Sequence, residues 1–589
     1  MFDLIYTGSV IVLMTALLIK EVTRPSMILF STLLLLILGK IITVEEALHG
    51  FSNQGMLTVG LLFIVAAAIQ SSSRFENIVT WLLGKRKDVK LRYTRLMFPV
   101  ATLSAFINNT PVVASLIPIV SSWAKKNGLP VSKFLIPLSY AAILGGLCTL
   151  IGTSTNLVIH GMMLDNGMEG FAFFDIGKVG FPVAIIGITF FTIFGKRILP
   201  IRKLALVQFE ENTRKFVVEL QVNKNYPHIG KSLHEAGLRR LQGLYLFQII
   251  RDGKTIAPVS RHEILHENDH LFFTGLPETI FELQKEQGLT IVPDGQYDPQ
   301  NIDSDKIKTY EVVISNVSPL LGKKVKNSNF RNRYNAAILG IHRAGSRINE
   351  KIGDIELKAN DTLFILAQKD FYDKWYHSMD FSLVTSSVES YSKPEKKGNI
   401  ALILLVAMIA AATLKLIPIM LSAAITVILL IMGKIISFND AKKSVDMDVL
   451  IIIASAFGIG NAMMNSGLAN YVAVAIIAAL RGLGPIGIVA GMFIVTSIYT
   501  EIITNNAGAA IMFPIALSVS QNLQMDAMPF IMAVVIGASA SFATPIGYQT
   551  NLLVYNVGGY KFTDFLRTGL MMNILAGIVT VFMIWYWYL

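Results

Sequence analysis

Each half of this sequence contains a short polar segment whose side chains could bind an anion together with its accompanying cations. The segments consist of hydroxyl- and amide-bearing residues, namely Ser104, Asn108, Asn109 and Thr110 in the N-terminal half and Thr500, Thr504, Asn505 and Asn506 in the C-terminal half. Both segments interrupt apolar sequence, and polar backbone is costly in lipid unless it lines a cavity. Ser104 and Thr500 precede the asparagine pairs by about one helical turn, so their hydroxyls can face the same point.

A second polar interruption follows the first in each half. Residues 152–156 read Gly-Thr-Ser-Thr-Asn, and their counterpart is the segment from Thr544 to Asn551. Unwound backbone exposes carbonyls that can ligate a hard cation such as sodium, while the N-termini of half-helices present amide hydrogens to an anion. A single such residue could instead link two helices by a hydrogen bond. Paired interruptions in both halves favour a transport site.

Four further polar residues lie near these segments. Glu501 precedes the amide pair of the second half and could either carry protons or organise the site. His160 stands near a predicted helix end, where we expect a structural role. Asp175 and Asp564 lie at predicted membrane edges, and we expect them to cap helices.

The two halves are similar to each other along their length. Four blocks recur in order at an offset between 389 and 396 residues: 39–42 as 433–436, 108–118 as 504–514, the segment ending at Asn156 as that ending at Asn551, and Asp175, Lys178 and Gly180 as Asp564, Arg567 and Gly569. Ordered matches of this kind indicate a duplication, which is how many transporters are built. We therefore predict two membrane repeats, residues 1–198 and 398–589. Five crossings in each would make the second repeat inverted relative to the first.

The composition predicts a membrane protein. Of the 589 residues 53% are hydrophobic and 15% are charged, and the mean hydropathy is +0.55. The net charge of +11 lies largely in short loops beside apolar runs, where basic residues orient helices, so we expect no nucleic-acid partner. The single cysteine, Cys148, excludes an internal disulfide.

A soluble insert, residues 199–397, separates the two membrane repeats. Its charged residues are frequent, and its apolar residues form short alternating runs that predict strands. Basic loops lie on the side of the insert, so the positive-inside rule places the insert in the cytoplasm and both termini outside the inner membrane. The insert is itself repeated at a 92-residue spacing, as in Asn268 and Asp269 against Asn360 and Asp361.

The two copies of this internal repeat resemble the TrkA-C domain, a regulatory module of channels and transporters. The resemblance is carried by segments such as "SPLLGKKV", "AAILGIHRAG" and "LKANDTLFIL". It implies two α/β domains, at residues 205–290 and 305–385. Two hypotheses for them remain open: control of transport by a small ligand, for example a cyclic dinucleotide, or support of a dimer.

The membrane repeats resemble the divalent anion/sodium symporter family of the ion-transporter superfamily. That family has in each half a re-entrant hairpin tipped by a Ser-Asn-Thr motif, followed by an unwound helix. The resemblance implies a homodimeric, elevator-type symporter in membrane lipid, coupled to sodium. The predicted anion ligands are Asn109, Thr110, Thr153, Asn156, Asn505, Asn506, Thr544 and Asn551. The predicted sodium ligands are Ser104, Asn108, Asn109 and Gly152 for one ion, and Thr500, Thr504, Asn505, Ala543 and Gly547 for the other.

The resemblance leaves several functions to compare. The resemblance to members with TrkA-C-like inserts implies sulfate as the favoured substrate of this protein, with a dicarboxylate as the second choice. A sodium/proton antiporter would place Glu501 in its path. A ligand-gated channel is disfavoured because the sequence has no repeated selectivity-filter motif. An enzyme is disfavoured because neither half combines a nucleophile, a base and an orienting group or shows a metal-ligand cluster.

Overall fold

The chain folds into two compact units in the computed structural model. The structure describes residues 1–20, 22–70, 89–202, 217–238, 244–257, 259–260, 262–275, 288–292, 307–315, 318–343, 346–348, 350, 352–375, 378, 380–386, 398–414 and 416–589. The membrane unit comprises Met1–Ile201, Ser392–Val554 and Lys561–Leu589. The insert unit comprises Arg202–Tyr391 together with Tyr555–Tyr560.

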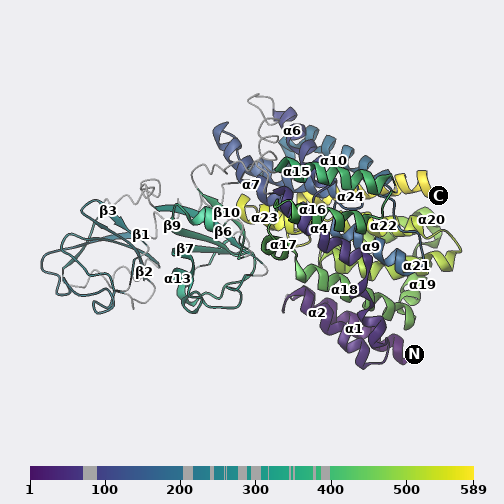
Figure 1. Cartoon of the computed structure of the whole chain (residues 1–589), viewed down its shortest axis with the longest axis horizontal. Helices are drawn as coiled ribbons and strands as arrows, with labels where there is room; N and C mark the ends of the chain where they lie inside the picture. Colours follow the sequence, from purple (N-terminus) through teal and green to yellow (C-terminus); the bar gives the residue numbers. More distant parts are fainter. Residues whose placement is uncertain are drawn as a thin grey trace. The chain divides into compact units, whose positions relative to one another are not determined.

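The membrane unit consists of helices that occur in the same order in both halves (Figure 1). The N-terminal half contains α1 (Phe2–Ile19), α2 (Pro25–Leu38), α3 (Val44–His49), α4 (Gln54–Gln70), α6 (Val89–Ser104), α7 (Asn109–Lys126), α8 (Ser132–Gly146), α9 (Ser154–Asp165) and α10 (Gly177–Ile198). The C-terminal half contains α15 (Gly398–Thr413), α16 (Ile419–Met432), α17 (Phe438–Ser444), α18 (Met447–Asn465), α19 (Leu468–Leu480), α20 (Gly484–Thr500), α21 (Asn505–Leu523), α22 (Met528–Ser539), α23 (Gln549–Gly558) and α24 (Phe562–Tyr588). The counterpart of α19 would fall on residues 71–88, outside the described part of the chain.

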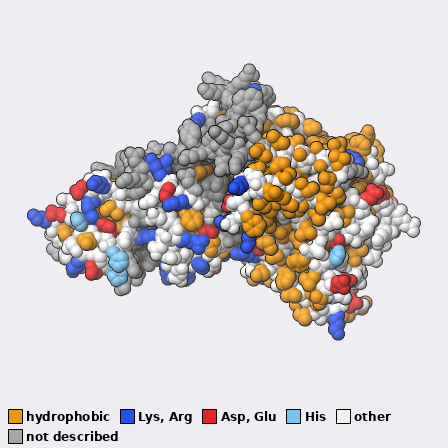
Figure 2. Space-filling view, in the orientation of Figure 1, with side chains coloured by type: hydrophobic (Ala, Val, Ile, Leu, Met, Phe, Trp, Pro, Cys, Tyr) orange, Lys and Arg blue, Asp and Glu red, His pale blue; other side chains and the backbone are white. Residues whose placement is uncertain are grey.

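The helices of the membrane unit are apolar on their outer faces. Among the described residues, six segments are long and apolar enough to cross a membrane. Large hydrophobic side chains such as Val12, Ile193, Ile428 and Ile578 are exposed, and Figure 2 shows hydrophobic side chains gathered over the helical part. An apolar surface of this extent is stable in lipid rather than in water. The chain is therefore a multi-pass membrane protein.

The helices that surround the polar interruptions pack in the same way in both halves. Helix α6 packs against α8 and α10, and α20 packs against α22 and α24. The first interruption of each half separates α6 from α7 and α20 from α21, and the second separates α8 from α9 and α22 from α23. Helices α10 and α24 pack against each other across the halves. Each predicted polar interruption thus lies between two helices of the packed unit.

The insert unit contains two five-stranded sheets with the same strand order. The strands of the first sheet are β1 (Val217–Val222), β2 (Leu244–Arg251), β3 (Lys254–Ile256), β4 (His270–Gly275) and β5 (Leu289–Ile291), in the order β3-β2-β4-β1-β5. Those of the second are β6 (Ile307–Ile314), β7 (Ala336–Arg343), β8 (Ser346–Arg347), β9 (Thr362–Gln368) and β10 (Phe381–Ser386), in the order β10-β6-β9-β7-β8. Short helices α13 (Phe330–Tyr334) and α14 (Phe371–Trp375) accompany the second sheet.

The registers of the two sheets also agree at the 92-residue spacing. Leu220 pairs with Leu271 in the first sheet, and Val312 pairs with Leu363 in the second. Besides its own core, each sheet contributes to a shared apolar cluster, in which Phe247 and Phe272 meet Leu339, Phe364 and further residues of the second sheet. The two sheets are therefore held together by burial of apolar side chains.

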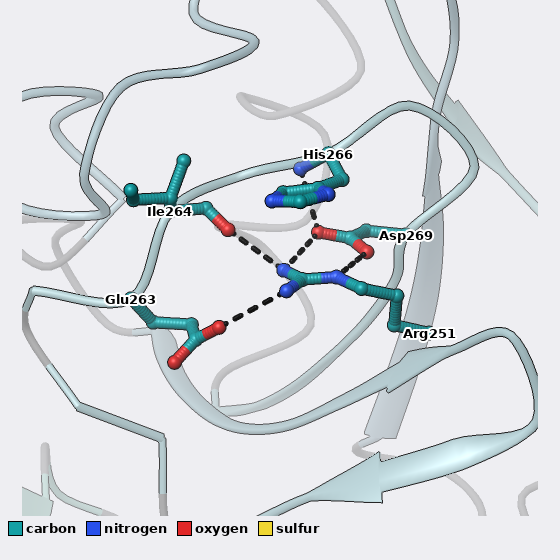
Figure 3. Close-up of polar contacts among 5 residues, drawn as sticks. All are labelled: Arg251, Glu263, Ile264, His266 and Asp269. Carbon is teal, nitrogen blue, oxygen red and sulfur yellow. Dashed lines mark hydrogen bonds and ion pairs between the residues drawn. The ribbon is translucent and has the colours of Figure 1, made fainter.

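A buried ion pair recurs at the same place in each sheet. Figure 3 shows that Arg251 forms a fork with Asp269, through Nε to Oδ1 at 2.7 Å and Nη2 to Oδ2 at 2.9 Å. Arg343 and Asp361 make the same two contacts, at 2.7 and 2.8 Å. Both aspartates are fully buried, and the hydrogen bonds that Arg343 donates to Asp361 raise the pKa of the Arg343 guanidinium. The preceding residue, Asn360, has a positive φ of 64°, a conformation that asparagine tolerates well.

Replacing Asp361 by asparagine should destabilise the insert by about 2 kcal/mol, because the buried carboxylate would no longer accept charge-assisted hydrogen bonds from the partly exposed Arg343 guanidinium. Hydrogen exchange of the full-length protein should then show faster exchange of the amides in β7 and β9. Asp354→Asn is the matched control, since Asp354 pairs with Lys326 at an exposed site worth less than about 1 kcal/mol. Equal protection in both variants would contradict the assignment.

Candidate functional site

The tip between α6 and α7 is closed by hydrogen bonds around Asn109. This side chain is fully buried, and its partners fix the orientation of its amide. Its nitrogen donates to Ala142 O at 2.9 Å and to Ser104 Oγ at 2.6 Å, and its oxygen accepts from the Tyr548 hydroxyl at 2.5 Å. Gly152 O lies 3.3 Å from the same nitrogen. Three of the predicted ligands of the first sodium ion, Ser104, Asn109 and Gly152, are therefore brought together.

Asn108, the fourth predicted ligand of that ion, lies at a cavity beside the tip. Asn108 and Ser154 are the polar residues of its lining, and α4 contributes apolar residues, among them Leu62 and Phe63. The cavity thus reaches both the first tip and the start of α9.

Each tip contacts the unwound segment of the other half. Thr110 Oγ1 donates to Gln549 Oε1 at 3.1 Å. In the corresponding place Ser154 Oγ and Thr155 Oγ1 donate to Asn506 Oδ1, each at 3.1 Å. At the centre of this crossing, Thr153 Oγ1 lies 3.0 Å from the Tyr548 hydroxyl. Asn109 and Thr153 therefore share the Tyr548 hydroxyl, and the predicted anion ligands Thr110 and Asn506 each make a separate bond between the two halves.

Asn156 and Asn551 hold the two unwound segments in the same way. Asn156 Nδ2 donates to Gly146 O at 3.0 Å and to Thr149 O at 2.8 Å. Asn551 Nδ2 donates to Ser541 O at 3.0 Å and to Thr544 O at 3.1 Å. These carbonyls lie ten and seven residues before each asparagine, so the same pair of hydrogen bonds occurs in both halves. Their role as anion ligands stays a prediction.

The predicted ligands of the second sodium ion include buried oxygens without a partner. Thr504 Oγ1 and Asn505 Oδ1 are buried and have no hydrogen-bond partner among the described residues. Thr500 Oγ1, by contrast, donates to Thr496 O at 3.0 Å. The backbone at Gly547 approaches other polar groups closely, because a Cβ there would lie 2.4 Å from Ser541 Oγ and 3.0 Å from Glu501 Oε2.

Glu501 fixes the second unwound segment. Its Oε1 accepts from Ala543 N at 2.7 Å and from Asn573 Nδ2 at 2.8 Å, and its Oε2 accepts from Thr544 N at 2.8 Å. Its own carbonyl accepts from Thr544 Oγ1 at 2.9 Å. The carboxylate therefore satisfies two backbone amides that the unwound segment leaves without a helical partner.

The remaining candidates make local contacts. His160 Nδ1 accepts from Phe171 N at 3.0 Å. Asp175 Oδ2 accepts from Ala172 N at 2.7 Å, and Asp564 Oδ2 accepts from Lys561 N at 2.8 Å at the start of α24. His160 and Asp564 thus make the structural and capping contacts that the sequence predicted for them. The prediction for Asp175 was wrong, because α10 begins at Gly177 without a side-chain cap and Asp175 bonds within the preceding turn.

The sequence reasoning missed Tyr548 and Gln549, which contribute to the central network. Both lie between Gly547 and Asn551, in a segment that aligns without a gap to residues 152–156. The alignment of "GTSTN" with "GYQTN" was the available signal, because it puts Tyr548 opposite Thr153 and Gln549 opposite Ser154.

Comparison with known proteins identifies the family. A family model described as citrate transporter matches residues 14–537 and 485–589. A protein of Chlamydomonas reinhardtii that carries the name sulfur deprivation response regulator is 32% identical, over 96% of this chain and 98% of its own length. An uncharacterized transporter of Synechocystis is 30% identical over 93% and 91%. Sodium/sulfate cotransporter 1 of C. reinhardtii is 26% identical over 92% and 85%.

These matches extend over nearly the whole chain, including both tips and both unwound segments. The resemblance to the divalent anion/sodium symporters is thereby confirmed at the level of the family. The chain belongs to the citrate transporter family of the ion-transporter superfamily.

Proposed function

We propose that this protein is a secondary transporter that takes up a divalent anion, with sulfate favoured over a dicarboxylate, together with sodium ions. The observation that carries the proposal is the crossing of the two halves, in which each tip bonds to the unwound segment of the other half. Hydroxyls and amides from both halves meet there, and such groups can bind an oxyanion without a permanent positive charge.

The relatives support sulfate as the substrate. Sodium/sulfate cotransporters 1 and 2 of C. reinhardtii are each 26% identical to this chain over more than nine-tenths of its length. The family model, by its description, supports a carboxylate as the alternative. Sulfate and dicarboxylates both present paired oxygens to hydrogen-bond donors, so the network alone does not choose between them.

Sodium coupling is supported by the oxygens at the second tip. Thr504 Oγ1 and Asn505 Oδ1 are buried without a hydrogen-bond partner in the described structure, and hard cations prefer oxygen ligands. These two residues, with Thr500, Ala543 and Gly547, would hold one ion. Ser104, Asn108, Asn109 and Gly152 would hold another. A bound sodium ion would offset the charge of the anion in the low-dielectric interior.

The recurring helix order supports two inverted repeats, each with five crossings and a re-entrant hairpin formed by α6 and α7 or by α20 and α21. In this topology the insert is cytoplasmic and both termini are outside. We further propose an elevator-type motion in a homodimer, and TrkA-C-like domains at residues 205–290 and 305–385 that regulate transport, with a cyclic dinucleotide as a candidate effector.

A sodium/proton antiporter is the second candidate, because Glu501 is a buried carboxylate beside the site. Its two oxygens accept three hydrogen bonds, two of them from backbone amides of the second unwound segment. This arrangement favours a structural role for Glu501 and therefore the symporter.

Uptake of radiolabelled sulfate and, separately, succinate into proteoliposomes tests the proposal, with and without an inward sodium gradient. We expect sodium-dependent sulfate uptake in the wild type and its loss in Asn109→Ala and Asn505→Ala.

In Thr504→Val the KM for sodium should rise about tenfold, since one oxygen ligand is lost. Thr102→Val is the matched control, because the exposed Thr102 hydroxyl bonds only to Phe98 O in its own helix. Sodium-driven proton release without anion uptake would overturn the symporter.

A further inference from the structure

Tyr548 occupies the centre of the proposed site, although its counterpart in the other half is a small residue. Tyr548 aligns with Thr153, 395 positions earlier, and their hydroxyl groups lie 3.0 Å apart. Two residues at equivalent positions of a duplicated structure meet only near the axis that relates the copies. The Tyr548 hydroxyl therefore lies where the two halves cross.

The phenol at this position is enclosed by the predicted anion ligands. Tyr548 is 8% exposed, and its hydroxyl reaches Asn109 as well as Thr153. A group that binds the amide oxygen of Asn109 must therefore share that oxygen with the Tyr548 hydroxyl or displace it. The hydroxyl can donate to an oxyanion in turn, since a phenol is both donor and acceptor.

The two tips consequently differ in what they offer to a ligand. Both N–H groups of the Asn109 amide have partners, Ala142 O and Ser104 Oγ, and its oxygen accepts from Tyr548. Asn505, its counterpart, keeps a buried oxygen without a partner in the described structure. On the Asn109 side the position equivalent to Thr153 carries the phenol of Tyr548, a much larger side chain that is 8% exposed. The two tips are alike in sequence position, but the residues beside them differ in size.

We propose that Tyr548 determines the specificity of the site, its ring limiting the cavity to a compact tetrahedral oxyanion and its hydroxyl donating a hydrogen bond to that anion. This inference rests on the proposed function and narrows its substrate class. An anion with two carboxylates separated by a carbon chain is longer than a tetrahedral oxyanion, so a bulky ring at the centre of the site would disfavour it. The exclusion is steric, and the recognition is by hydrogen bonding, so the two effects can be separated by mutation.

Two variants separate these effects in the proteoliposome assay. Tyr548→Thr copies the residue of the other half, and we expect the ratio of sulfate to succinate uptake to fall at least tenfold as succinate enters. Tyr548→Phe keeps the ring and removes the hydroxyl, and we expect the KM for sulfate to rise about tenfold while succinate stays excluded. Tyr93→Phe is the control, since Tyr93 is a buried tyrosine of α6 that packs on Phe134, and it should change neither value.

The outcomes distinguish this inference from the proposed function. A wild type that takes up neither anion overturns both. A wild type that takes up sulfate, with an unchanged ratio in Tyr548→Thr, overturns the role of Tyr548 alone. If Tyr548→Thr takes up neither anion, Tyr548→Phe decides, and an unchanged sulfate KM in that variant overturns the inference.

Discussion

Replacing Glu501 by glutamine is expected to reduce anion uptake at least tenfold and to lower the melting temperature of the purified protein. The carboxylate accepts from the backbone amides of Ala543 and Thr544 and from the side chain of Asn573. Glutamine has one acceptor oxygen, so its NH2 group would face a donor and leave a buried N–H without a partner. An unsatisfied buried group costs about 3 kcal/mol here, or roughly 100-fold in an equilibrium between ordered and disordered forms of the segment.

Sulfate uptake and thermal unfolding in detergent, measured on the same preparations, check this prediction. Glu45→Gln is the matched control. It removes the same charge, but from an exposed position in the first turn of α3. Asn573→Ala should have a smaller effect than Glu501→Gln because both backbone donors keep their acceptor. If Glu501→Gln retained the wild-type melting temperature and lost only a proton-dependent flux, the carboxylate would be a proton carrier.

The paired polar interruptions were predictable from the sequence because lipid makes them costly. A run of hydroxyls, amides and glycines inside apolar sequence stands out against its surroundings, and its recurrence in the second half excludes chance. The positions at which α7 and α21 begin, Asn109 and Asn505, are accordingly among the residues predicted to form the site. Their partners were not predictable in this way. Gln549 and Tyr548 meet the first half only in the folded chain, and composition says nothing about which side chains meet.

The sequence predicts that a residue is polar and central, but it does not show whether its side chain binds the transported ion or hydrogen-bonds to the protein backbone. Asn156 and Asn551 are predicted anion ligands, and their Nδ2 atoms also donate to nearby carbonyls, while Asn156 Oδ1 is buried without a partner among the described residues. The distinction depends on where a carbonyl points, which is a property of the unwound backbone. Glu501 was left open for the same reason, since its neighbours in space, Ala543 and Asn573, lie about 40 and 70 residues farther along the chain.

The insert shows the same division between local pattern and long-range contact. Alternating apolar residues and the repeated Asn-Asp pairs predict strands joined by turns, and the strands form two sheets with one common order. The arginines that pair with Asp269 and Asp361 come from the ends of neighbouring strands. The shared cluster around Phe247 and Phe364 arises because each sheet has an apolar face left over after its own core is formed. An apolar residue in a strand does not reveal which partner covers it.

Replacing Gly569 by alanine is expected to abolish uptake and to destabilise the membrane unit, and Gly180→Ala should do the same in the first half. A Cβ at Gly569 would lie 2.0 Å from Phe542 O and 2.5 Å from Ala543 Cα, and one at Gly180 would lie 1.8 Å from Leu147 O. Backbone atoms cannot move aside as the end of a flexible side chain can. Helix α24 or α10 would have to separate from the unwound segment that it supports, at a cost of about 3 kcal/mol.

A side chain at Gly569 would disturb the site directly. Ala543 lies next to Gly569, and its backbone N–H donates to Glu501. Gly482→Ala is the matched control, since a Cβ at Gly482 meets nothing within 4 Å. We expect Gly482→Ala to match the wild type in sulfate uptake and melting temperature, with Gly180→Ala and Gly569→Ala both impaired. Normal uptake by Gly569→Ala would mean that α24 does not need to contact the unwound segment during transport. The segment would then be positioned by Glu501 and Asn551 alone.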